Sequence, residues 1–249
     1  MTAALVLAVY AVLVASAGPS VMLRAQWPQR APRLGLAVWH ALGLSFLLSV
    51  MLTLYGLAMP SRHLHLALVG LLHSCGIHGG AVATAADRVA LALPVGVFAV
   101  FLACLCLRLT GNALARARHR HAVDLVGRKM PELGVTVLPY DQPAAYCLPG
   151  HGARIVVTEA ALRDLTAAQL DAVLEHERGH VRGRHHLLLA VADAFRLAFP
   201  GVALARELHR QTGLLLEMAA DDRALRRHGS ASLASALVKL AQARTVWGA

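Results

Sequence analysis

The chain has 249 residues, of which 57% are hydrophobic and only 15% are charged, and its formal net charge is +10. This apolar excess excludes an ordinary water-soluble enzyme and indicates helices that cross a membrane. The positive charge does not predict direct binding of nucleic acid, because no helix-turn-helix or aromatic-interleaved basic motif accompanies it. Basic segments beside membrane helices explain it more simply. The four cysteines form no CxxC pair and are expected to be free thiols: Cys75, Cys104, Cys106 and Cys147.

Three long apolar stretches predict three membrane-spanning helices, at residues 2–23, 34–59 and 89–107. The first could instead be a signal peptide, but it lacks a basic start and further spans follow it. Arginines concentrate between the first two spans and after the third. The positive-inside rule therefore predicts a multi-pass protein of the cell membrane, with its amino terminus outside. We divide the chain into a transmembrane region, residues 1–110, and a cytoplasmic domain, residues 111–249.

The predicted outer loop, residues 60–88, is rich in histidine and contains Cys75. A metal-sensing or metal-uptake site is one interpretation. A segment at the membrane interface, where neutral histidines are well tolerated, is the simpler one. Residues 64–72 are apolar enough to dip into the bilayer. A full crossing there would invert the topology, and the arginines after the third span argue against it.

The basic pattern from residue 112 to about residue 130 predicts a helix that leaves the membrane along its cytoplasmic surface. Three short strands are expected next, at residues 135–138, 144–148 and 154–157. The last two surround a Pro-Gly-His-Gly sequence and are expected to pair like a hairpin.

Two helix starts follow the strands. Thr158 is a plausible N-cap of a short helix, and Thr166 with Gln169 matches the capping-box pattern of the next helix, which Gly183 should end. Residues 186–199 are apolar but too short for a confident span, so we expect a half-buried helix lying against the membrane helices. Two more helices, the last at residues 232–246, complete the pattern.

The helix that begins after Thr166 carries the sequence HExxH, formed by His176, Glu177 and His180. Residues four apart lie on one face of a helix, so both imidazoles can bind one metal ion. Glu177 leans into the same space and can accept a proton from a water molecule beside the metal. Zn2+ suits two imidazoles with an open position, so one zinc per chain is expected. The alternative is a solvated helix face in an Arg- and His-rich protein.

A third ligand is expected from Glu217, on a later helix, because a carboxylate there would complete a two-histidine, one-glutamate zinc site. Asp221 lies one turn further on the same face and can hold the second nitrogen of a ligand histidine. A solvent-facing Glu and Asp pair is the alternative. His185 and His186, directly after the HExxH helix, are weaker ligand candidates.

The sequences HERGHVRGRHHLLL, residues 176–189, and EMAADDRAL, residues 217–225, resemble membrane metallopeptidases of the gluzincin type. They look most similar to the BlaR/MecR family, with HtpX and CAAX prenyl proteases as more distant relatives. The resemblance covers residues 110–230 by motif. With the spans, it implies a mainly α membrane protein with a cytoplasmic α+β zinc metallopeptidase domain that contains a small β-sheet.

The resemblance also implies a zinc-dependent endopeptidase that acts on a protein or peptide substrate, for which a transcriptional repressor of the BlaI/MecI type is the leading candidate. In such enzymes an edge strand beside the active helix pairs with the substrate. Either of the strands at 144–148 and 154–157 could be that strand. No external sensor domain matches those of the BlaR/MecR proteins, so sensing of β-lactams by this chain is not expected.

Two other functions remain open from the sequence. One is an HtpX- or CAAX-like protease for quality control or processing, and the other is a non-enzymatic, zinc-binding membrane receptor. An oxyanion-stabilising donor is also needed for proteolysis. His209, Arg223 and His228 are the nearby candidates, and the sequence does not choose among them.

Overall fold

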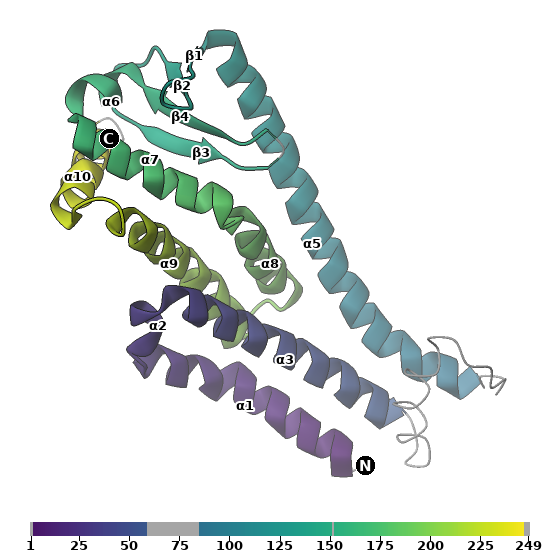
Figure 1. Cartoon of the computed structure of the whole chain (residues 1–249). Coiled ribbons are helices and arrows are strands. Elements are labelled where there is room, and N and C mark those ends of the chain that lie inside the picture. Colours follow the sequence, from purple (N-terminus) through teal and green to yellow (C-terminus); the bar gives the residue numbers. More distant parts are fainter. Residues whose placement is uncertain (1, 59–84, 151, 247–249) are drawn as a thin grey trace, which may run out of the picture. The chain divides into compact units, whose positions relative to one another are not determined.

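The computed structural model describes residues 2–58, 85–150 and 152–246, with the backbone alone at 85–90 and 243–246. The chain divides into two compact units. The helical unit contains Met1–Gln26, Ala37–Cys106 and Ala192–Arg210, and the sheet unit contains Trp27–Leu36, Leu107–Val191 and Gln211–Ala249. Figure 1 shows the elements of both units, which we describe one at a time. The histidine-rich loop and Cys75 lie outside the described residues.

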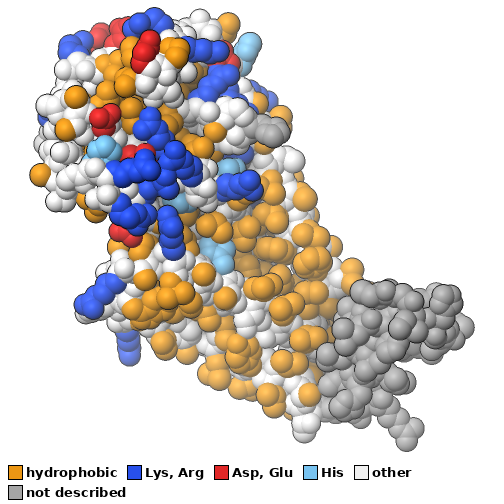
Figure 2. Space-filling model, in the orientation of Figure 1, with side chains coloured by type: hydrophobic (Ala, Val, Ile, Leu, Met, Phe, Trp, Pro, Cys, Tyr) orange, Lys and Arg blue, Asp and Glu red, His pale blue; other side chains and the backbone are white. Residues whose placement is uncertain are grey.

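Long apolar helices form most of the helical unit. α1 spans Thr2–Arg24, α3 spans Pro32–Ala58 and α5 spans Ala85–Val126. Within the described residues, these three helices are long and apolar enough to cross a membrane. Large side chains such as Val6 and Val12 are about two-thirds exposed, which suits a hydrocarbon environment rather than water. Figure 2 shows this hydrophobic covering. The prediction of three spans is confirmed.

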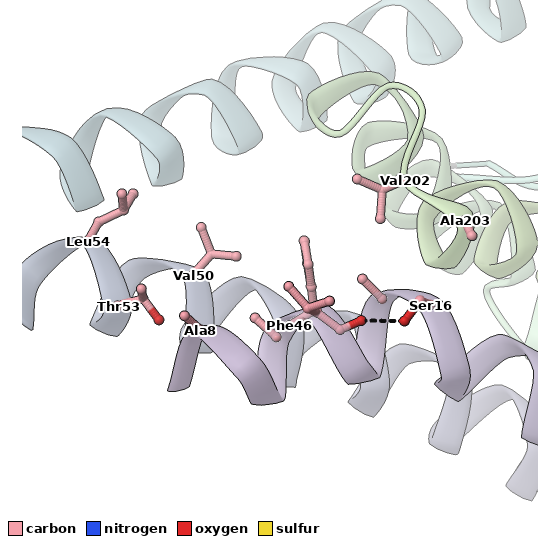
Figure 3. Close-up of a pocket in the computed structure, with 11 residues that line it drawn as sticks. Ala8, Ser16, Phe46, Val50, Thr53, Leu54, Val202 and Ala203 are labelled. Atoms are coloured by element: carbon pink, nitrogen blue, oxygen red, sulfur yellow. Dashed lines mark hydrogen bonds between the residues drawn. The ribbon is translucent and has the colours of Figure 1, made fainter. Parts of the chain in front are cut away.

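The end of α8, which spans His185–Ala198, and the start of α9, which spans Ala203–Leu225, also belong to the helical unit. Phe195 packs edge-on against Phe46 of α3 and Phe101 of α5, with ring centroids 6.0 and 6.1 Å apart. This packing matches the half-buried helix expected from the sequence. Beside the turn between α8 and α9, an apolar cavity of about 430 Å³ is lined by residues of α1, α3 and that turn (Figure 3).

A mixed four-stranded sheet is the centre of the sheet unit. Its order is β1-β2-β4-β3, for β1 (Arg128–Met130), β2 (Val135–Leu138), β3 (Ala145–Leu148) and β4 (Arg154–Thr158). β2 and β4 are parallel, and the two outer pairs are antiparallel. The hairpin-like pairing of β3 with β4 is therefore confirmed.

Alternating side chains build a core on each face of this sheet. Val137 and Val157 face a core shared with α6 (Glu159–Asp164), α7 (Ala167–Arg182) and α10 (Ser230–Val246). On the other face, Val156 and Leu148 pack against Val123 of α5. The sheet thus lies between the end of α5 and a layer of three helices, of which α7 carries HExxH.

The start of α7 is fixed by local hydrogen bonds that its sequence predicts. Thr166 accepts a hydrogen bond from the Gln169 N–H, and the Gln169 side chain accepts one from the Thr166 N–H, so the capping box is complete. Thr158 caps α6 in the same position as expected, and Gly183 ends α7. These caps set where the HExxH turn lies along α7.

One expected element is wrong in part. The helix predicted from residue 112 to about residue 130 is the continuation of the third span, and it ends at Val126. Residues 128–130 form β1 instead. A Cβ atom at Gly127 would lie 2.5 Å from the Val123 carbonyl oxygen and 2.6 Å from a methyl group of Thr136. Only glycine allows the chain to pass this close to β2, so the helix stops there.

A candidate metal centre in the sheet unit

The two HExxH histidines and Glu217 lie together, as the sequence predicts. His176 and His180 stand one turn apart on α7, with their Nε2 atoms 3.1 Å apart. Oε2 of Glu217, from α9, is 3.5 Å from Nε2 of His176 and 3.6 Å from Nε2 of His180. The three ligand atoms form a triangle in which every side is shorter than 4.8 Å.

This triangle has the size and the chemistry of a zinc site. A zinc ion about 2.0–2.1 Å from each of three tetrahedrally placed donor atoms would hold those atoms roughly 3.3 Å apart. The observed separations of 3.1 to 3.6 Å bracket that value. Hydrogen bonds from the two histidines hold the pKa of the Glu217 carboxyl well below its usual range, so it is ionised and ready to bind a cation.

Each ligand histidine has a partner for its other ring nitrogen. Nδ1 of His176 is 2.8 Å from Oδ1 of Asp221, the residue that the sequence places one turn beyond Glu217. Nδ1 of His180 is 2.9 Å from Nδ1 of His185. Burial lowers the pKa of His185 to about 4. His180 thus contacts Glu217 through Nε2 and His185 through Nδ1.

The close approach of two helices brings Glu217 to the histidines. A Cβ atom at Gly179 would lie 3.2 Å from Cα of Ala220 and 3.4 Å from its Cβ. Gly179 is the third residue after His176, so the two helices touch at Gly179 and Ala220, within the HExxH turn of α7. A larger side chain at either position would separate the helices and move Glu217 away from the histidines.

The model of peptidase family M48 matches residues 110–243, which is more than half of the chain. The chain belongs to peptidase family M48. It is also similar to an HtpX protease homologue of Pelotomaculum thermopropionicum, with 38% identity over 79 residues. That match covers 30% of this chain and 27% of the relative, so the chain spans about a quarter of the length of the curated relative it matches. No solved structure matches the chain.

The chain thus contains three long apolar helices and a domain of peptidase family M48, as the spans and the HExxH motif predicted. Glu177 follows His176 on α7, is half-buried, and lies beside Cys147 of β3. Burial raises the pKa of its carboxyl above the usual value, while the nearby histidines oppose the shift. A carboxylate with a raised pKa is a better proton acceptor near neutral pH, which suits a general base in this peptidase.

Cys147 of β3 is a neighbour of Glu177 that the sequence analysis did not include in the site. Its thiol hydrogen-bonds to the Glu177 carboxylate, and burial, with the Glu177 charge adding to it, raises the pKa of the thiol to about 12. The thiol therefore stays protonated and donates. Strand alternation is the signal that could have found it, since Cys147 shares the α7-facing side of β3 with the buried Ala145.

A buried carboxylate surrounded by arginines lies on the opposite flank of α7. The Glu175 side chain is 2% exposed, and it pairs with Arg223 at 2.8 Å, Arg182 at 3.3 Å, Arg227 at 3.4 Å and Arg178 at 3.8 Å. Figure 2 shows basic side chains gathered over α7 and α9. This cluster ties the helix of the histidines to the helix of Glu217.

Each of the three candidate oxyanion donors has another partner among the described residues. Arg223 donates a hydrogen bond to Glu175, and His209 pairs with Asp193 in the helical unit at 3.1 Å. His228 follows α9, and its backbone N–H donates to the Ala224 carbonyl. Within the described part of the chain, no hydrogen bond or ion pair joins any of the three to the metal-binding residues.

Proposed function

We propose that this M48 peptidase is a zinc-dependent endopeptidase that cuts a protein held in extended form beside β3. The observation that carries the proposal is the triangle of His176, His180 and Glu217 with Glu177 next to it. The ligand residues differ in exposure, since the His176 side chain is 7% exposed and the Glu217 side chain 62%. A substrate can therefore approach from the Glu217 side.

Each residue has a role in this proposal. His176, His180 and Glu217 hold the zinc, and Asp221 accepts a hydrogen bond from Nδ1 of His176, which keeps the Nε2 lone pair free for the metal. A zinc ion held there supplies Lewis acidity to the scissile carbonyl and to the attacking water. Glu177 takes the proton of that water and passes it to the leaving amine. The Cys147 thiol orients the Glu177 carboxylate.

The substrate strand is proposed to pair with β3, because β3 is at the edge of the sheet and packs against α7, whereas β4 lies inside. The Ala144 carbonyl accepts a hydrogen bond from the Thr158 N–H of β4. In an antiparallel pair the bonding direction alternates, so the backbone groups of Ala145 and Cys147 point away from β4. These groups do not bond to β4, and we propose that they pair with an extended peptide, which would bind with little sequence demand.

Replacing Ala145 with proline tests this pairing. The change removes one outward N–H, and because the Ala145 side chain is buried in the core, thermal unfolding must first show that the variant folds. The folded variant should have a KM raised about fivefold to tenfold with little change in kcat. Peptide cleavage kinetics give both values. Ala144→Pro is the matched control, because the Ala144 N–H bonds Thr158 within the sheet and its loss should destabilise the fold. An unchanged KM for folded Ala145→Pro would place the substrate elsewhere.

The arginine distribution supports a proposed topology in which the amino terminus is outside the cell membrane and the peptidase domain, residues 111–249, is cytoplasmic. The substrate is then a cytoplasmic protein. By the resemblance to BlaR/MecR proteins, we propose a regulatory role in which a BlaI/MecI-type repressor is cleaved. The similarity to an HtpX protease homologue favours a second candidate, a membrane protease for quality control or processing.

A substrate comparison separates these roles. The full chain, purified in detergent with one equivalent of zinc, is incubated with a candidate repressor and with casein, alongside samples stripped of metal by a chelator. Zinc-dependent cleavage that prefers the repressor supports the regulatory role, and equal cleavage of casein supports the HtpX-like role. A zinc-loaded protein that cuts neither substrate would contradict the endopeptidase proposal and favour a zinc-binding receptor.

A further inference from the structure

The two ligand histidines are supported by different kinds of residue. A metal-binding histidine that coordinates through Nε2 carries a proton on Nδ1, and that proton needs an acceptor. Asp221 is the acceptor for His176. His180 faces no carboxylate at Nδ1 in the described structure, and the atom found there is Nδ1 of His185, at 2.9 Å. The rings of His180 and His185 meet edge-on, with centroids 4.8 Å apart at 85°.

The direction of this hydrogen bond follows from the metal site. Nε2 of His180 points toward Glu217, so a metal bound there leaves the proton of His180 on Nδ1. Nδ1 of His180 must then donate, and Nδ1 of His185 must accept. His185 can accept at Nδ1 only as the neutral imidazole with its own proton on Nε2. Its Nδ1 is thus engaged with His180 and is not a metal ligand in this arrangement.

The backbone between the two helices is shaped to place the His185 ring. Arg184 has a φ of +48°, a left-handed conformation that is strained for a non-glycine residue. This turn ends α7 and starts α8 directly at His185. A Cβ atom at Gly183 would overlap Nε2 and Cδ2 of the His185 ring, so the ring fills the space that glycine leaves open.

We propose that His185 is a positioning residue for the metal centre: it accepts a hydrogen bond from Nδ1 of His180 and holds the His180 ring with Nε2 toward the metal. The inference rests on the proposed zinc site. It names the residue that orients the second histidine ligand, as Asp221 orients the first. The positioning role also accounts for the turn between α7 and α8. The strained backbone at Arg184 and the missing side chain at Gly183 allow the His185 ring to lie against His180.

The test measures zinc affinity, by competition with a chromogenic chelator, on the full chain in detergent. His185→Phe keeps an aromatic ring but removes the acceptor, and it should weaken zinc binding about 10- to 100-fold. His185→Asp restores an acceptor and should recover most of the affinity. His186→Phe is the matched control, since His186 is adjacent in sequence and its Nδ1 has no hydrogen-bond partner among the described residues. It should bind zinc like the wild type.

A second variant, Gly183→Ala, displaces the His185 ring without changing His185 itself. Gly183 has a φ of −73°, which any residue adopts, so the Gly183→Ala backbone is unstrained and the variant acts mainly by displacing the His185 ring. It should lose zinc affinity at least to the degree of His185→Phe, because the added Cβ also lies 3.0 Å from the Gly179 carbonyl oxygen. Gly213→Ala is its control, because a Cβ at Gly213 meets no atom within 4 Å.

The outcomes are distinct. Wild-type zinc affinity in His185→Phe overturns the inference, and so does an Asp variant as weak as the Phe variant, since an acceptor at this position would then not restore zinc binding. X-ray absorption of the zinc-loaded protein gives a further check: loss of one nitrogen neighbour in His185→Phe would make His185 a ligand and overturn the positioning role. If the wild type binds no zinc, the proposed function itself fails, and these variants show no difference.

Discussion

Replacing Glu177 with glutamine should leave zinc bound and slow peptide cleavage by about a hundredfold or more. Glutamine has nearly the shape of glutamate and can accept the hydrogen bond from the Cys147 thiol, but it cannot take a proton from the attacking water. The ligand atoms of His176, His180 and Glu217 are unchanged. Single-turnover cleavage of a fluorogenic peptide, with zinc content measured by atomic absorption, tests both halves of the expectation.

Two controls make this result specific. Glu132→Gln makes the same chemical change at an exposed turn and should have wild-type activity. Glu217→Gln should lose activity together with zinc, because it removes a proposed ligand. Full activity in a zinc-loaded Glu177→Gln protein would mean that another group is the base. A loss of zinc in that variant would instead mean that Glu177 supports the metal rather than the proton transfer.

The second large effect is expected on stability. Replacing Glu175 with alanine leaves four arginines facing one another with no carboxylate between them, in a place where the carboxylate is 2% exposed. The arginines left behind are 24–61% exposed and partly solvated, so the loss of these charged hydrogen bonds should cost about 1–3 kcal/mol. For a chain of this size the midpoint of thermal unfolding should fall by roughly 2–12 °C. Differential scanning fluorimetry in detergent measures the shift.

The arginines should contribute unequally. Arg223 makes the shortest contact, and its side chain is 24% exposed, so Arg223→Gln should have a clear effect on the midpoint. Arg182 is 53% exposed, and water screens its pairing, so Arg182→Gln should cost about 1 kcal/mol or less. If Glu175→Ala unfolds at the wild-type temperature, the cluster does not hold α7 and α9 together.

The elements that the sequence predicted well are those defined by local chemistry. The capping box at Thr166 and the N-cap at Thr158 need only residues within one helical turn. The spacing of the histidines within HExxH, and of Glu217 and Asp221 on α9, follows from the helical repeat. Apolar stretches of membrane length predict spans because the bilayer has a fixed thickness.

The features that were missed depend on contacts between distant segments. β1 was expected to be helix, because nothing near Gly127 in sequence reveals that Thr136 will pass within van der Waals distance. Cys147 gave no signal as part of a catalytic site, since a lone cysteine in an apolar strand usually serves as packing. His185 was considered only as a ligand, and its contact with His180 depends on the left-handed turn at Arg184.

Helix α9 is one uninterrupted helix, yet its first residues belong to the helical unit and the part with Glu217 belongs to the sheet unit. Leu204 and Leu208 in its first half are buried, and Leu208 packs against Gly43 of α3. A fragment that starts after the third span would therefore carry an unprotected hydrophobic strip on the same helix that supplies a metal ligand. Biochemical work on the proteolytic centre accordingly calls for intact protein in micelles or nanodiscs.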